Sequence, residues 1–143
     1  MQAKLVKSAK FSRIKNDILG KNYSLSIAYV TPAKSRELNK KYRKKDKATN
    51  VLSFALRRDM GELLLCAEVI KKEAKEKKFG KNLKDLIGFL VIHGMLHLKG
   101  LKHSSTMEKE EEKYDKKYFS RNRRRVIRSP RRGGRVLERR NKS

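Results

Sequence analysis

Residues 93–103 read His93-Gly94-Met95-Leu96-His97-Leu98-Lys99-Gly100-Leu101-Lys102-His103, and they hold all three histidines of the chain. His93 and His97 are four residues apart, so on a helix their side chains lie on the same face. Gly100 is placed to end that helix, because glycine adopts the left-handed backbone conformation at low cost. The turn redirects the chain, so His103 can come back toward the same point. Three neutral imidazoles that leave a fourth position open are the ligand set of a catalytic zinc site, so this stretch predicts one bound Zn²⁺ ion.

Other interpretations of the stretch compete with a metal site. Single histidines are usually structural, a basic protein can place them near a phosphate, and an apolar helix can carry two of them by chance. The spacing also matches the metzincin protease pattern H-E-x-x-H-x-x-G-x-x-H. Gly94 stands where that pattern has the glutamate that acts as general base. The sequence therefore favours a zinc site that serves a reaction other than peptide hydrolysis.

The residues before His93 predict how the two first ligands are held. Asn82 is a good N-cap for a helix. That helix is apolar over much of its circumference, through Leu83, Leu86, Ile87, Leu90 and Val91. We expect it to be the buried central helix of the domain, which would hold His93 and His97 rigidly.

The rest of the chain reads as alternating helices and strands. Helical spacing and stop signals predict three helices, over 8–19, 31–43 and 67–79. The second begins at Thr31-Pro32 and ends at Arg43, and Leu38 and Tyr42 are expected to face inward from it. Alternating or β-rich runs predict strands over 23–30, 49–56 and 61–66, the last two joined as a hairpin. Ser105 to Glu108 fits a capping box for a final, solvated helix to Phe119. The expected fold is α+β, a small mixed sheet of about four strands with helices packed on it, in an order that the sequence does not reveal.

The composition of the chain limits the kinds of partner that it is expected to bind. The formal net charge is +25 over 143 residues, which favours a polyanion such as RNA as the partner over a merely solvated lysine-rich surface. Cys66 is the single cysteine and lies in an apolar run, which fits a buried residue in a reducing cytoplasm. We find no signal peptide and no apolar run near the roughly 20 residues of a membrane span, so no membrane partner is expected.

Residues 121–143 differ from the body of the chain. This tail has ten arginines and one lysine, whereas the body has five arginines and 24 lysines. It has few core-forming residues, so we expect residues 1–120 to form the domain and the tail to be disordered by itself. Two interpretations stay open: an acquired RNA-binding arm, or an extension without a selected role.

Two segments resemble the YbeY-type bacterial endoribonucleases. Residues 93–103 are similar to that family's signature H-G-x-L-H-L-x-G-[YF]-D-H, and residues 41–54 to its block Y-R-x-K-D-x-x-T-D-V-L-S-F. Residues 61–66 are similar to its strand G-D-I-x-I-x, and the match runs in family order from about residue 5 to about residue 119. Asn50 and Glu62 stand where the family favours aspartate. Lys102 replaces the aspartate before the third histidine, where a carboxylate could orient a ligand.

The resemblance implies a zinc-dependent endoribonuclease that acts on single-stranded RNA, in maturation of the small-subunit 3′ end of ribosomal RNA and in ribosome quality control. His93, His97 and His103 would bind the metal, with Arg43 and His93 as catalytic residues and Lys44, Lys45 and Lys47 as RNA-binding residues. The lysines have a second explanation, because basic residues favour the end of a helix. Ribosomal RNA and the small ribosomal subunit are the expected partners, and DNA is not. The alternative is a ribosome-assembly factor that binds RNA and whose zinc is mainly structural.

Overall fold

A computed structural model describes residues 4–102 and 104–119 of the chain. These residues form a four-stranded sheet in the order β1-β2-β4-β3. Its strands are β1 (Lys4–Leu5), β2 (Ser24–Tyr29), β3 (Val51–Arg57) and β4 (Met60–Leu65). β2 runs parallel to β4, whereas the other two pairs are antiparallel, so the sheet is mixed. The expected α+β fold with about four strands is confirmed.

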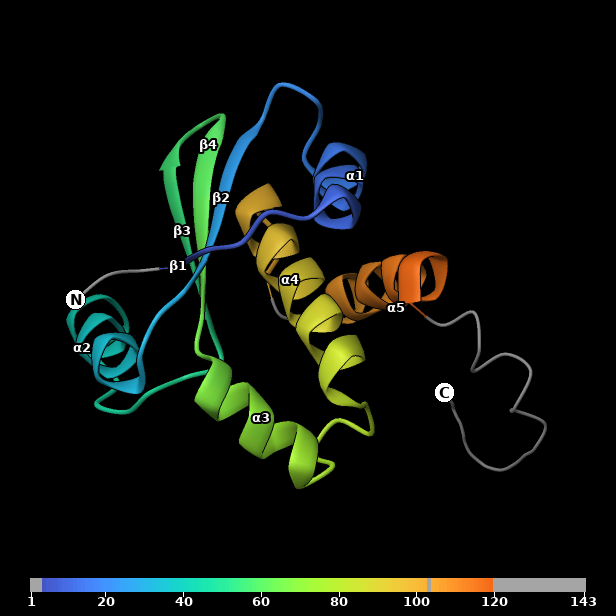
Figure 1. The fold of residues 1–143 in the computed structure, drawn as a ribbon. Helices are drawn as coiled ribbons and strands as arrows, with labels where there is room; N and C mark the ends of the chain where they lie inside the picture. Colours follow the sequence, from blue (N-terminus) through green and yellow to red (C-terminus); the bar gives the residue numbers. More distant parts are fainter. Residues whose placement is uncertain (1–3, 103, 120–143) are drawn as a thin grey trace.

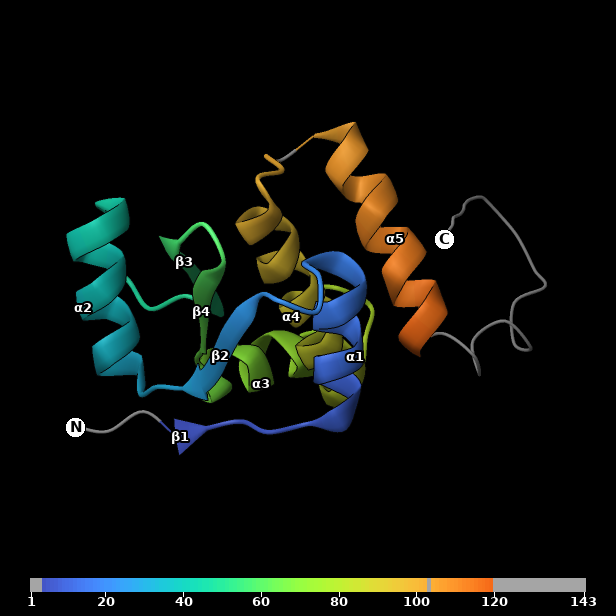
Figure 2. The ribbon, with the colours of Figure 1, turned by 90° about the horizontal axis from the view of Figure 1, so that it is seen from above.

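Helices cover both faces of this sheet. They are α1 (Ala9–Ile18), α2 (Pro32–Arg43), α3 (Ala67–Lys75), α4 (Leu83–Lys99) and α5 (Ser105–Phe119). Figure 1 shows α2 on one face and α1 and α4 on the other. In Figure 2, seen from above, α5 lies outside α4 and away from the sheet. The helix that carries His93 and His97 therefore lies between the sheet and a second helical layer.

The position of α4 follows from its sequence, as expected. The Asn82 side chain accepts a hydrogen bond from the Asp85 backbone amide at 2.8 Å, which caps the start of the helix. Gly100 ends it in the left-handed conformation, at φ 109°. Eight residues of α4 are buried, among them Leu86, Leu90, Ile92 and Leu96. The main core forms around them, and its burial holds the histidine-bearing helix in place.

The other face of the sheet has a smaller core beneath α2. Ala28, Val30, Leu52 and Leu64 form it, with Leu38 and Phe54 packed against them. The expectation that Tyr42 faces inward is wrong, because 51% of this residue is exposed. The buried residues of α2 are instead the polar Ser35 and Asn39. They hold the loop that follows the helix, as described below.

Several boundaries differ from the sequence expectation. β1 was not expected, because two residues show no periodicity. α3 ends at Lys75 rather than near residue 79, and Lys77 then adopts a left-handed conformation at φ 56°. The side chain that caps α5 is Ser104 rather than Ser105, since its Oγ accepts from the Met107 amide at 3.2 Å. None of the helices in the described ranges is both long and apolar enough to cross a membrane.

His103 and the tail 121–143 lie outside the described residues. The division into a domain over 1–120 and an arginine-rich tail therefore stays a prediction.

Candidate metal centre and adjoining pocket

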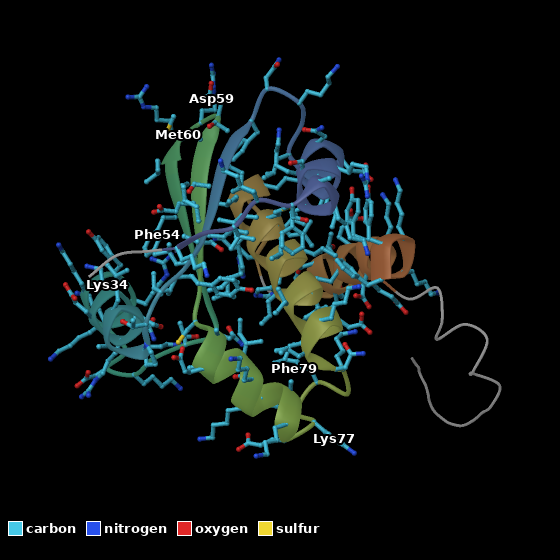
Figure 3. All side chains as sticks on the ribbon, in the orientation of Figure 1. Lys34, Phe54, Asp59, Met60, Lys77 and Phe79 are labelled. Carbon is cyan, nitrogen blue, oxygen red and sulfur yellow. The ribbon has the colours of Figure 1, made fainter. Side chains whose placement is uncertain are left out.

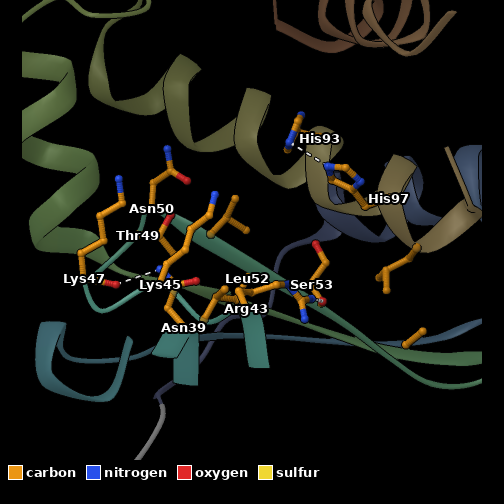
Figure 4. Close-up of a pocket in the computed structure, with 13 residues that line it drawn as sticks. Asn39, Arg43, Lys45, Lys47, Thr49, Asn50, Leu52, Ser53, His93 and His97 are labelled. Atoms are coloured by element: carbon orange, nitrogen blue, oxygen red, sulfur yellow. Dashed lines mark hydrogen bonds between the residues drawn. The ribbon is translucent and has the colours of Figure 1, made fainter. Parts of the chain in front are cut away.

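His93 and His97 meet on one face of α4, as their spacing predicted. Their Nε2 atoms are 3.1 Å apart, and the ring planes are nearly perpendicular, at 85°. Both side chains are partly buried and line a cavity of about 650 Å³. Figure 4 shows the two rings on α4, each turned toward the other at the wall of this cavity.

The Nδ1 atom of each ring is already engaged. His97 Nδ1 lies 3.2 Å from the Leu101 carbonyl oxygen, which can only accept, so this nitrogen carries the proton. His93 Nδ1 is paired with the Glu111 carboxylate from α5. With a proton on each Nδ1 atom, a ring without a second proton turns its Nε2 lone pair toward the other ring.

Two lone pairs at this separation repel unless a cation lies between them. A second proton on one ring or a metal ion bound by both nitrogens relieves this repulsion. Two imidazole ligands on a tetrahedral Zn²⁺ have their nitrogens about 3.3 Å apart, from the usual Zn–N distance. The Nε2 separation of 3.1 Å in the structure agrees with that value. The donor type, the tautomers and the spacing therefore all fit a zinc ion.

The third ligand expected from the sequence is His103, which the described residues do not include. Within 4–102 and 104–119, no group of three histidine, cysteine, aspartate or glutamate side chains is placed to hold a metal. The complete ligand set of His93, His97 and His103 therefore stays a prediction, of which the structure brings the first two together.

Glu111 is a site residue that sequence reasoning missed. The final helix was expected to be a solvated cover, but Met107 and Tyr114 are buried against the core and Glu111 reaches His93. A carboxylate on the far nitrogen of a ligand fixes its tautomer and raises its basicity. Nothing in the sequence distinguishes Glu111 from its acidic neighbours, because the contact spans 18 residues and depends on how α5 packs on α4. Glu111 thus supplies a carboxylate to the site although Lys102 replaces the family aspartate.

Arg43 shares the pocket with the two histidines, from the last residue of α2. Its Nη2 donates to the Ser53 carbonyl oxygen at 2.6 Å and its Nη1 to the Tyr42 carbonyl oxygen at 3.4 Å. These bonds use two of the five N–H donors of a guanidinium. The side chain is exposed, and Figure 4 shows it beside Ser53, across the pocket from the histidines.

The predicted RNA-binding lysines fall into two positions. Lys45 and Lys47 line the pocket. Lys44 is not a lining residue; it ends α2 in the left-handed conformation, at φ 61°. The structure thus brings two of the three lysines to the pocket, and the RNA-binding role of all three stays a prediction.

Buried polar side chains of α2 hold this basic loop. Ser35 Oγ accepts from the Thr49 amide at 2.9 Å and donates to the Thr49 carbonyl oxygen at 3.1 Å. The Asn39 amide donates to the Lys47 carbonyl oxygen at 2.8 Å. Because buried polar groups need partners, these bonds tie the backbone around Lys47 to α2 while the lysine side chains face solvent.

Close packing explains why residue 94 is glycine and not the glutamate of the peptidase pattern. A Cβ atom added there would lie 2.7 Å from a Leu63 methyl carbon and 3.1 Å from Ser53 Oγ. Ser53 Oγ also donates to the Gly94 carbonyl oxygen at 3.3 Å, so helix and strand are in direct contact at this point. A glutamate side chain has no room here.

Asn50 stands where the resembling family favours aspartate, and it also lines the pocket. Its side-chain amide donates to Glu73 of α3 at 2.8 Å. A carboxylate only accepts, so this bond turns the amide nitrogen of Asn50 toward α3.

The chain is similar to known proteins over most of its length. The chain is 36% identical to an endoribonuclease YbeY of Staphylococcus carnosus over 61% of this chain and 63% of that protein. It is 40% identical to the endoribonuclease YbeY of Chromobacterium violaceum over 74% of this chain and 66% of that protein. The chain thus spans less than two thirds of the length of each of these two relatives.

A solved structure has the same fold. The solution structure of TM1509 from Thermotoga maritima matches with a TM-score of 0.58 and 28% identity, covering 88% of this chain and 87% of that one. The family model described as endoribonuclease YbeY matches residues 2–121, which include both histidines of the pocket, Arg43 and Glu111. The chain therefore belongs to the endoribonuclease YbeY family.

Proposed function

We propose that this protein is a zinc-dependent endoribonuclease that cleaves single-stranded RNA. The observation that carries the proposal is the pair of facing Nε2 atoms of His93 and His97, in one pocket with Arg43. Family membership supports the same activity, since the relatives carry the name endoribonuclease.

His93, His97 and His103 would hold the metal. Bound Zn²⁺ supplies Lewis-acid chemistry at neutral pH. Glu111 and the Leu101 carbonyl oxygen keep both Nδ1 atoms protonated, which leaves the Nε2 atoms as the ligating positions. The protein itself would thus contribute a pair of ligands whose tautomers are set without the metal.

Arg43 would act on the phosphodiester. Hydrogen bonds to Ser53 and Tyr42 hold its guanidinium in place, so little conformational entropy is lost when it binds a phosphate. A guanidinium aimed at the phosphate oxygens offsets the negative charge that builds up in the transition state. Attack by water and attack by the ribose 2′-OH both place that charge on the same oxygens.

The substrate class follows from the shape and charge of the pocket. Lys45 and Lys47 line it, and the net charge of +25 attracts a polyanion. A single strand can bend its backbone into a pocket, whereas a regular duplex holds each phosphate on a stiff surface. The resemblance supports ribosomal RNA as the natural substrate, at the small-subunit 3′ end and in ribosome quality control, in the cytoplasm.

The alternative is an RNA-binding assembly factor with a mainly structural zinc. Its motivation is Lys102, which lacks the carboxylate favoured before the third histidine. Glu111 already gives His93 a carboxylate partner, and this weakens the alternative.

One experiment distinguishes the endoribonuclease, the assembly factor and the peptidase. The full chain is treated with a chelator, restored with Zn²⁺, and assayed on single-stranded RNA and on casein, beside His97→Ala and Arg43→Ala. We expect RNA cleavage that depends on restored zinc and is lost in both variants, with casein intact. Zinc binding without RNA cleavage would support the assembly factor, casein cleavage would support a peptidase, and RNA cleavage that survives in His97→Ala would contradict the proposed site.

A further inference from the structure

An aromatic side chain stands exposed beside the pocket. Tyr42 lies in the last turn of α2, and 51% of it is exposed. Its ring meets the ring of Phe54 nearly edge-on, with centroids 5.3 Å apart and planes at 70°. Phe54 therefore fixes the orientation of Tyr42 without covering it.

Cations flank this aromatic pair. The Arg43 guanidinium lies 5.1 Å from the Phe54 ring centroid, and the Lys41 ammonium lies 5.2 Å from the Tyr42 ring centroid. Single exposed aromatic residues are common on proteins and need no function. Aromatic rings interleaved with basic side chains, however, are the composition of surfaces that bind single-stranded nucleic acid.

The pair is continuous with the pocket through Arg43. This residue follows Tyr42 directly, packs over Phe54, bonds to the carbonyl of Ser53 and lines the cavity that contains His93 and His97. Ser53 and Phe54 are neighbours on the edge strand β3, so their side chains point to opposite faces of the sheet. If a phosphate of the RNA binds Arg43, the next nucleotide along the RNA would lie on the face of the β3 edge where Tyr42 and Phe54 stand.

We propose that the Tyr42 ring stacks on a nucleobase of single-stranded RNA, next to the phosphate held at Arg43. The proposal deepens the proposed function and rests on it. The base would take the place of the Lys41 ammonium over the ring, since base stacking is stronger than an exposed cation–π contact. Lys41 is exposed on a flexible stem and would then pair with a phosphate.

Binding of RNA to the full chain tests the stacking. With chelator present, so that cleavage does not interfere, anisotropy of a labelled single-stranded RNA of about ten nucleotides gives the affinity. Tyr42→Ala is expected to bind about tenfold more weakly than the unaltered chain. The dependence of affinity on salt should stay the same, because no phosphate contact is lost. Tyr42→Phe keeps the ring and is expected to restore most of the affinity.

The matched control is Phe79→Ala. Phe79 is also a partly exposed aromatic residue, at 38%, and it lies beyond the end of α3, apart from β3 (Figure 3). The control is expected to bind RNA as the unaltered chain does.

A fluorescence measurement gives a second, independent readout. The chain has no tryptophan, so Tyr42→Trp introduces a single reporter. RNA is expected to quench this fluorescence by stacking. A base-free oligomer with the same number of phosphates is expected to bind without quenching, and Phe79→Trp to respond to neither.

The outcomes separate the two proposals. Equal affinity of Tyr42→Ala and the unaltered chain, or equal quenching by the base-free oligomer, would overturn the stacking. If the unaltered chain still cleaves RNA after zinc is restored, the proposed function survives that result. An unaltered chain that neither binds nor cleaves RNA would overturn both.

Discussion

The two sides of the pocket are built in different ways. On one side, His93 and His97 stand on α4, which has eight buried residues, six of them in the main core. On the other, Arg43, Lys45 and Lys47 are exposed, and their segment is tied down by Ser35 and Asn39 of α2. Apolar packing fixes the metal side, whereas hydrogen bonds fix the basic side.

The difference suits what each side is proposed to bind. Metal ligands must keep their nitrogens within a few tenths of an ångström of the required positions, and a close-packed helix changes little on the time average. A polyanion is attracted over a longer range by charges that remain in water. The basic side therefore needs a held backbone but not a buried one.

The substitution with the largest expected effect on stability lies in α4, on the histidine side of the pocket. Leu96 is fully buried beside His97, so Leu96→Ala should lower the free energy of unfolding by about 3 kcal/mol in urea denaturation. Leu38→Ala, the same change in the smaller core under α2, should cost only about 1 kcal/mol because Leu38 is partly buried. Equal losses in the two variants would contradict the contrast between the two sides.

A second substitution tests the support of the metal ligand. Glu111→Ala removes the carboxylate paired with His93 and should lower zinc affinity about 10- to 100-fold, measured by competition with a chromophoric chelator. Glu112→Ala removes an exposed carboxylate of the same helix and controls for the change in net charge. If both variants lose the same affinity, Glu111 acts through charge alone.

The basic side is tested by Ser35→Ala. This change removes two hydrogen bonds to Thr49 and should lower the free energy of unfolding by about 1–2 kcal/mol, with faster exchange of the Thr49 amide hydrogen. Ser12→Ala makes the same substitution at an exposed position of α1. Slow exchange of the Thr49 amide in Ser35→Ala would show that other contacts hold the loop.

The smallest effect concerns the outer layer of the metal side. Lys117 and Tyr118 of α5 donate to Asp17 of α1 at 2.6 and 2.7 Å, and these bonds hold the pKa of Asp17 below its usual 3.8. A lowered pKa stabilises the fold above pH 3.8, and this contribution is lost as pH falls through the lowered value.

Asp17→Asn should therefore lower the free energy of unfolding by about 1 kcal/mol near neutral pH, and by less in acid. Thermal unfolding measured from neutral to acidic pH checks this. Asp59→Asn, in the turn between β3 and β4, serves as the control. A cost for Asp17→Asn that does not change with pH would rule out the charge as its cause.

Much of the fold was predictable because its signals are local. Asn82 and Gly100 bound α4, Thr31 and Pro32 begin α2, and the β3–β4 hairpin follows from two β-rich runs joined by a short turn. The spacing of His93 and His97 likewise determined that their rings meet, because four residues make about one helical turn.

Apart from local boundaries such as the end of α3 and the cap of α5, the incorrect predictions involve partners that lie outside the same helical or strand pattern. Tyr42 was expected to pack inward with Leu38, but the small core ends before it and leaves its ring exposed. Ser35 and Asn39 are buried because they bond to a loop 14 and 8 residues away, which no helical pattern encodes. The strand order, with β2 beside β4, depends on a parallel pairing across the α2–β3 segment.

The sequence by itself determined the family, the helix that carries His93 and His97, and the strong positive charge. Tertiary structure alone decided that Glu111, rather than another glutamate of α5, meets His93, and that Arg43 crosses the edge of β3 into the same pocket. Local propensity and spacing act over a few residues, whereas these contacts depend on how whole helices pack against a sheet.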